Sequence, residues 1–133
     1  MRSEAGLTLI EVLVAVVITF VIFLGITNAG LVVLDQNIKN LQRDQAVSVA
    51  DNVMQQARNI PYDNLVLTTT TDNVFVQVRG SDRTYAVTRN IAAIDNVNAA
   101  LGRQVTVTVS WTRTEYGQPR TYNHTIMTIV RPR

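Results

Sequence analysis

A run of 23 residues without a charged side chain, from Val12 to Leu34, constrains the fold of this chain more than any other feature. As an α-helix this run would be about 35 Å long, which is enough to cross a hydrocarbon layer of about 30 Å. Its many β-branched residues would suit a strand in water, but an isolated strand in lipid leaves its backbone groups without hydrogen-bond partners. The run therefore predicts a membrane-spanning helix.

A single carboxylate, Glu11, directly precedes this run, and the next charged residue is Asp35. A charge in a membrane helix is costly and marks a functional site whose partner has to be identified. If the chain were cut after Gly6, the new ammonium group of Leu7 would lie one helical turn from Glu11 on the same face. Glu11 is therefore the main candidate functional residue, with an N-terminal amine as its expected partner.

A removable secretory signal peptide is an alternative interpretation, with cleavage before Gly30. Two observations count against it. The segment before the run carries Glu4 and Glu11 against Arg2 alone, and the run exceeds the 7–15 apolar residues that are usual in such signals. The helical pattern also continues beyond the run, which favours a helix that is retained.

Beyond the run the helix becomes amphipathic. Apolar residues recur at spacings of three and four, while polar residues, Gln42 among them, occupy the other face. Pro61 cannot continue a helix, so we expect one helix from about Leu7 to Asn59. Gly25 and Gly30 lie within it and mark either a hinge or a close packing contact. The apolar stripe consists of Leu34, Ile38, Leu41, Ala46, Val49, Ala50, Val53, Met54, Ala57 and Ile60.

After Tyr62, itself in an expected turn with Asp63, the period changes to alternation, which is typical of strands. We expect loops or turns at 68–71, 80–82, 92–102 and 115–119. Four antiparallel strands with one apolar face need a cover, and the helical stripe from Ala46 to Ala57 provides it. The sequence thus predicts an α+β fold, a long N-terminal helix packed on a four-stranded antiparallel sheet over about residues 74–131. The expected strands are 74–79, 83–91, 105–112 and 121–130.

The sequence offers no set of residues that resembles a catalytic or metal site. His124 is the only histidine and there is no cysteine, whereas acid–base catalysis and metal binding need several groups. We expect His124 to lie at the surface and Trp111, which shares a strand face with three valines, to lie in the core. The arginines occur mostly singly, as on a solvated sheet face, which argues against direct nucleic-acid binding. We expect neither enzymatic activity, nor a metal, nor a cofactor.

The segment Gly6-Leu-Thr-Leu-Ile-Glu-Val-Leu-Val-Ala15 resembles the prepilin signature of type IV pilins and type II secretion pseudopilins. The resemblance implies that prepilin peptidase cuts after Gly6 and methylates the new N-terminus at Leu7. It also implies that Glu11 serves in subunit assembly. Leu7 departs from the phenylalanine that is usual as the first mature residue. The chain also lacks the helix-bending proline and the two C-terminal cysteines of the best-known major pilins.

Residues 50–63 and the strand 105–111 resemble minor pilins of the PilV-like class. GspI-like pseudopilins are the alternative, and a non-polymerising periplasmic binding protein with a single span is another. The resemblance implies a leader at 1–6, a transmembrane and assembly half of the helix at 7–34, and a periplasmic head at 35–133. It implies as partners other pilin and minor pilin subunits, the prepilin peptidase and an inner-membrane assembly platform. The implied location is the inner membrane, then a pilus or a periplasmic pseudopilus.

Overall fold

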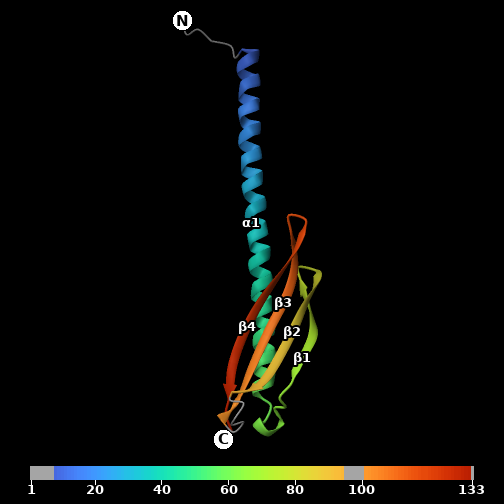
Figure 1. Cartoon of the computed structure of the whole chain (residues 1–133). Helices are drawn as coiled ribbons and strands as arrows, with labels where there is room; N and C mark the ends of the chain where they lie inside the picture. Colours follow the sequence, from blue (N-terminus) through green and yellow to red (C-terminus); the bar gives the residue numbers. More distant parts are fainter. Residues whose placement is uncertain (1–7, 95–100, 133) are drawn as a thin grey trace. The chain divides into compact units, whose positions relative to one another are not determined.

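The computed structural model describes residues 8–94 and 101–132 and confirms the predicted α+β fold (Figure 1). The chain divides into two compact units, the first ending at Asn40 and the second beginning at Leu41. The elements are the helix α1 (Leu9–Arg58), a short 3-10 helix η1 (Tyr62–Asn64), and the strands β1 (Thr69–Val78), β2 (Ser81–Ala93), β3 (Arg103–Glu115) and β4 (Gln118–Val130).

The described part of the first unit consists of Thr8 and the first part of α1, from Leu9 to Asn40. Two threonine hydroxyls inside the apolar run donate to the backbone of the preceding turn, Thr19 to Ala15 O at 2.8 Å and Thr27 to Phe23 O at 2.9 Å. These bonds satisfy polar groups that would otherwise oppose burial in lipid. The helix continues without a break through both glycines, and a Cβ atom added at either would have no neighbour within 4 Å.

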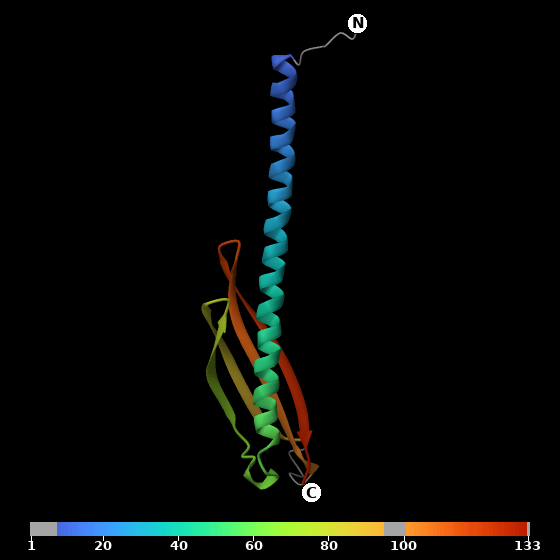
Figure 2. The same cartoon turned by 180° about the vertical axis from the view of Figure 1, so that it is seen from behind.

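In the second unit, the end of α1 covers one face of the sheet, as Figure 2 shows from behind. The buried apolar residues of this part of α1 lie within the predicted stripe: Ala46, Val49, Ala50, Met54 and Ala57. The helix ends at Arg58, three residues before Pro61, where the prediction placed its end near Asn59. Arg103 then fixes the chain after the helix, because its guanidinium donates to the backbone oxygens of Tyr62 and Leu65.

Gln42 was expected on the wet face of the helix, and this prediction is wrong. Its side chain lies under the sheet and is only 3% exposed. Its Oε1 atom has no hydrogen-bond partner among the described residues. The hydroxyl of Tyr85 in β2 donates instead to the backbone oxygen of Gln42, at 3.2 Å. An amphipathic pattern assigns polar residues to solvent, so it could not identify a buried amide at this position.

The sheet has four antiparallel strands, as predicted, in the order β1-β2-β3-β4, and these strands are longer than expected. β1 begins at Thr69, so most of the loop predicted at 68–71 is strand. Threonine is β-branched and suits a pleated strand, and the hydroxyls of Thr71 and Thr88 bond across β1 and β2 at 3.2 Å. β2 extends to Ala93 into the loop predicted at 92–102. Pro119 belongs to the edge strand β4, a position where proline is tolerated.

Both hairpins turn over two residues, a tighter turn than predicted. Arg79 and Gly80 connect β1 to β2 with φ angles of 49° and 76°, and Tyr116 and Gly117 connect β3 to β4 with 51° and 77°. Two successive residues with positive φ are the mark of the type I′ turn, whose twist matches that of the flanking strands. Ser81 and Asp82, predicted in the turn, therefore belong to β2.

The core lies between the sheet and the second part of α1. Trp111 is partly buried and packs against this core, as expected. Three arginines that were expected on a solvated face, Arg89, Arg103 and Arg113, are half-buried instead. Besides the helix residues, the core contains Leu65, Tyr85, Val87, Ile91, Val105, Val107 and Val109.

The two hairpins separate from one another towards their turns. β2 and β3 pair from Ala93 with Arg103 to Ala86 with Ser110, and the pairing stops there. Beyond this point residues 81–85 pair only with β1 and residues 111–115 only with β4. Continued pairing would place Arg83 opposite Arg113, and like charges in that position are destabilising. Figure 1 shows the ends of the two hairpins apart from one another. The region between residues 81–85 and 111–115 is here called the notch.

Candidate processing and assembly site

The N-terminal site is organised by Thr8, the residue before the first turn of α1. The Thr8 backbone N–H donates to Glu11 Oε2 at 2.8 Å, and the Thr8 hydroxyl donates to the same oxygen at 3.0 Å. In return, the backbone N–H of Glu11 lies 3.4 Å from the threonine hydroxyl oxygen. This reciprocal arrangement is a capping box. The carboxylate satisfies the Thr8 N–H, which has no partner inside the helix, while the Glu11 N–H also donates to the Thr8 backbone oxygen at 3.0 Å.

The capping box gives Glu11 a role within its own helix, in addition to the predicted role in subunit assembly. The signal was present in the sequence, because threonine followed three residues later by glutamate, ahead of an apolar run, is the usual pattern. The carboxylate also lies at the N-terminal end of the helix dipole, which favours negative charge. Glu11 is thus stabilised within its own chain before any partner approaches.

Only one carboxylate oxygen of Glu11 is used in this way. Both bonds from Thr8 go to Oε2, and Oε1 has no hydrogen-bond partner among the described residues. The side chains next along the same helix face are small, Ala15 and Thr19, and a shallow groove runs from Glu11 past them to Phe23. Small side chains let a second helix approach closely in a membrane. The geometry leaves one oxygen of Glu11 accessible to a neighbour.

The apolar surface around this site is not covered by the described part of the chain. Every large apolar side chain from Leu9 to Leu34 is between 48% and 88% exposed. The helix is long and apolar enough to cross a membrane, judged by length and composition. A surface of this kind requires lipid or other apolar helices as its surroundings, which is consistent with membrane anchoring.

Two of the predicted site residues, Gly6 and Leu7, lie outside the described residues. The predicted cleavage between them, and the methylation of Leu7, therefore remain predictions.

In the head, the titratable residues at the β3–β4 end of the sheet form a local network. The hydroxyl of Tyr122 donates to Glu115 Oε1 at 2.7 Å, and Arg113 and Arg120 lie 3.8 and 3.9 Å from the same carboxylate. The hydrogen bond to Glu115 raises the pKa of Tyr122. His124 is half-buried on the strand face that carries Tyr122, rather than at the surface as expected. No group of three or more metal-binding side chains occurs among the described residues.

Residues 1–27 match the family described as the prokaryotic N-terminal methylation motif. The match covers Gly6, Leu7, the capping box and most of the apolar run. It supports a relationship to proteins of the type IV pilin and pseudopilin kind, which are processed as prepilins. No curated protein and no solved structure matches the chain.

Proposed function

We propose that this chain is a minor pilin of a type IV pilus, of the PilV-like class, processed after Gly6 and methylated on Leu7. The observation that carries the proposal is the N-terminal methylation motif at residues 1–27, followed by an apolar helix with an uncovered surface. In this proposal residues 1–6 are the leader, 7–34 the transmembrane and assembly half of the helix, and 35–133 the periplasmic head. The head supplies specific contacts with other subunits.

Assembly would depend on Glu11. In the membrane a lone carboxylate without a counter-charge is costly, and docking beside a positive group removes that cost. The Leu7 ammonium of a neighbouring subunit would approach Glu11 Oε1, while Oε2 stays bound to Thr8. Such a pairing has only one favourable axial position, so it would set the register between adjacent helices as well as strengthen their contact.

The partners in this proposal are prepilin peptidase, an inner-membrane assembly platform, and other pilin and minor pilin subunits. The chain would lie in the inner membrane with its head in the periplasm and then move into the pilus. A GspI-like subunit of a type II secretion pseudopilus has the same N-terminal motif and remains the second candidate. A membrane-anchored periplasmic binding protein that never polymerises would keep residues 1–6.

The test of processing is the intact mass of the full chain extracted from membranes of the producing bacterium. Processing predicts the loss of residues 1–6 and the gain of one methyl group, and Gly6→Val should leave the mass of the precursor. A wild-type chain that keeps its leader would contradict the proposal and favour the non-polymerising alternative.

The test of assembly is the amount of the subunit recovered in sheared filaments. Glu11→Ala should be cleaved like the wild type yet recovered at least tenfold less. Glu11→Gln is the matched variant, because it keeps the shape and the acceptor oxygen but loses the charge. Normal recovery of Glu11→Ala would refute the role of Glu11. Co-purification with secretion-system subunits instead of pili would select the pseudopilin candidate.

A further inference from the structure

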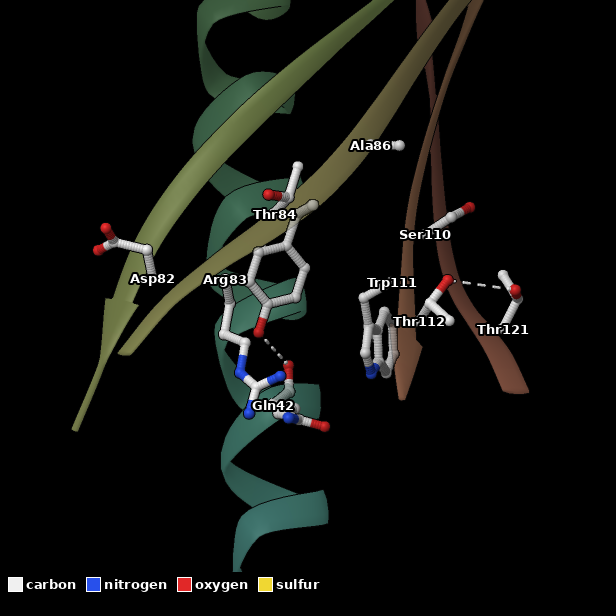
Figure 3. A pocket seen from close by; sticks show the side chains of 10 residues that line it. Gln42, Asp82, Arg83, Thr84, Ala86, Ser110, Trp111, Thr112 and Thr121 are labelled. Carbon is white, nitrogen blue, oxygen red and sulfur yellow. Dashed lines mark hydrogen bonds between the residues drawn. The ribbon is translucent and has the colours of Figure 1, made fainter. Parts of the chain in front are cut away.

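The notch between the two hairpins forms a cavity in the head. It has a volume of about 480 Å³, and its lining comes from α1, β2, β3 and β4. The lining includes Arg83, Tyr85, Gln42 and Trp111. Figure 3 shows Arg83, Gln42 and Trp111 directed towards this space. All four residues belong to the second unit, so the cavity is independent of the N-terminal site.

Two strand edges that do not pair with one another face each other across the notch. In an antiparallel strand, alternate residues direct their N–H and C=O groups to each side. One side of residues 81–85 is paired with β1 and one side of residues 111–115 with β4, which leaves the other sides directed at the notch. An extended chain inserted here would be able to form hydrogen bonds with both edges.

The floor of the notch contains a polar group that lacks a partner. Gln42 is only 3% exposed, and its Oε1 atom has no hydrogen-bond partner among the described residues. A buried acceptor without a donor is uncommon in folded proteins and requires an explanation. Since the Gln42 side chain lines the notch, a donor from a bound segment would satisfy it.

The side chains beside Gln42 define the chemistry of an occupant. Trp111, which is partly buried, offers a ring surface, and its ring centroid lies 6.2 Å from that of the buried Tyr85, at an angle of 50°. Arg83 brings a positive charge close to the Tyr85 hydroxyl. Burial raises the pKa of Tyr85, and the charge of Arg83 opposes that rise, as expected for neighbouring groups. The notch therefore combines main-chain hydrogen-bonding edges, an aromatic ring, a buried amide acceptor and a cation.

We propose that the notch binds an extended peptide segment of another protein by strand addition, with a carboxylate side chain of that segment facing Arg83. The two unpaired edges favour a peptide over a small aromatic molecule, because such a molecule would leave the main-chain groups of both strands unsatisfied. The proposal goes beyond the proposed function, since it assigns a second binding site that works without the N-terminal motif.

The chain carries its own reporter for this site. Trp111 is the only tryptophan and lines the notch, so in the folded chain intrinsic tryptophan fluorescence is sensitive to an occupant of the notch. The experiment uses the full chain in detergent micelles and a synthetic probe, acetyl-Thr-Val-Asp-Val-Thr-Val-amide. Binding should produce a saturable shift in the emission of Trp111 and protect it from acrylamide quenching.

Two control peptides separate the contribution of main-chain hydrogen bonds to binding from that of the carboxylate. A probe with N-methyl groups on alternate backbone amides keeps every side chain but loses main-chain donors, and should bind at least tenfold more weakly. A probe with lysine in place of aspartate should also bind at least tenfold more weakly. Arg83→Gln should weaken binding of the aspartate probe and reduce its preference over the lysine probe. Arg43→Gln changes an exposed helix residue outside the notch lining. It should leave the affinity for the aspartate probe and the preference over the lysine probe unchanged.

Gln42→Met should weaken binding of the aspartate probe several-fold. Circular dichroism should show that the variant keeps its fold. The proposal is overturned if the aspartate probe gives no saturable change, or if the N-methylated probe binds as tightly. It is also overturned if indole or benzoate displaces the probe at equal concentration, which would identify the notch as a small-molecule site.

Discussion

Replacing Gln42 by methionine should stabilise the head, although it removes a polar side chain from a helix. Methionine has nearly the same length and shape, and the bond from the Tyr85 hydroxyl goes to the backbone oxygen of residue 42, so the exchange leaves that bond in place. What is removed is a carbonyl acceptor that is buried without a partner among the described residues. An unsatisfied buried group costs about 1–3 kcal/mol.

The expected gain in the free energy of unfolding is therefore about 1 kcal/mol, at the low end of that range, because some of the amide's other contacts are lost. For a head of this size such a gain raises the midpoint of thermal unfolding by about 4–8 °C. The assay is denaturant and thermal unfolding of the full chain in a mild detergent, followed through Trp111 fluorescence. Because Trp111 packs against the head core, its signal follows the head rather than the membrane helix.

Gln55→Met is the matched control, since Gln55 is an exposed residue of the same helix, and its exchange should stay within about 0.5 kcal/mol of the wild type. A loss of stability of 1 kcal/mol or more in Gln42→Met alone would refute the reasoning. It would mean that the amide already makes favourable contacts that outweigh the unsatisfied oxygen.

Three further predictions concern other parts of the fold. Gly102→Ala should destabilise the head by about 1–3 kcal/mol, measured by urea unfolding, because Gly102 has a φ of 139° and an added Cβ would lie 2.9 Å from Val130 O; wild-type stability would contradict the strain argument. Thr8→Val should speed amide hydrogen exchange in the first turn of α1 by about fivefold, for a lost cap of about 1 kcal/mol, while exchange in the head stays unchanged. Since the pKa values of Tyr85 and Tyr122 are raised, their contribution to stability is complete below the ordinary tyrosine pKa of about 10 and is lost as the pH rises through the folded-state values. Tyr85→Phe and Tyr122→Phe should each make the decline in stability above a pH of about 10 shallower, and an unchanged decline in both variants would exclude these residues as its cause.

The sequence predicted those parts of the fold that follow from local periodicity. The helix end near Pro61, the apolar stripe of α1 from Ala46 to Ala57 and the alternation of β3 depend on neighbouring residues and were correctly predicted, whereas Leu34 and Ile38 of the predicted stripe are exposed. The extra length of β1 was missed because a polar threonine run resembles a loop in composition, although threonine favours strands. The alternation of β3 also placed Trp111 in the core.

Features that depend on contacts between residues distant in sequence could not be predicted from local periodicity. The separation of the hairpins arises from the register between β2 and β3, which no local pattern specifies, and the burial of Gln42 follows from where the sheet lies on α1. His124 was assigned to the surface because no companion groups for a catalytic or metal site lie near it in sequence, yet its strand parity with Tyr122 would have placed it on the inner face. The capping box at Thr8 follows from a local pattern, threonine three residues before glutamate, and was therefore predictable from the sequence.

The capping box has a consequence for the order of events at the N-terminus. Both of its members lie after Gly6, so the proposed cut would remove the leader and leave the helix with the same first hydrogen bonds. The precursor and the mature subunit would then share one helix start, and proteolysis would not have to be accompanied by refolding. Cleavage would change only the chemical identity of the end, from an amide link to a free amine, one residue away from a carboxylate network that is already formed. Maturation would then add a positive charge at the N-terminus of a helix whose first turn is already formed.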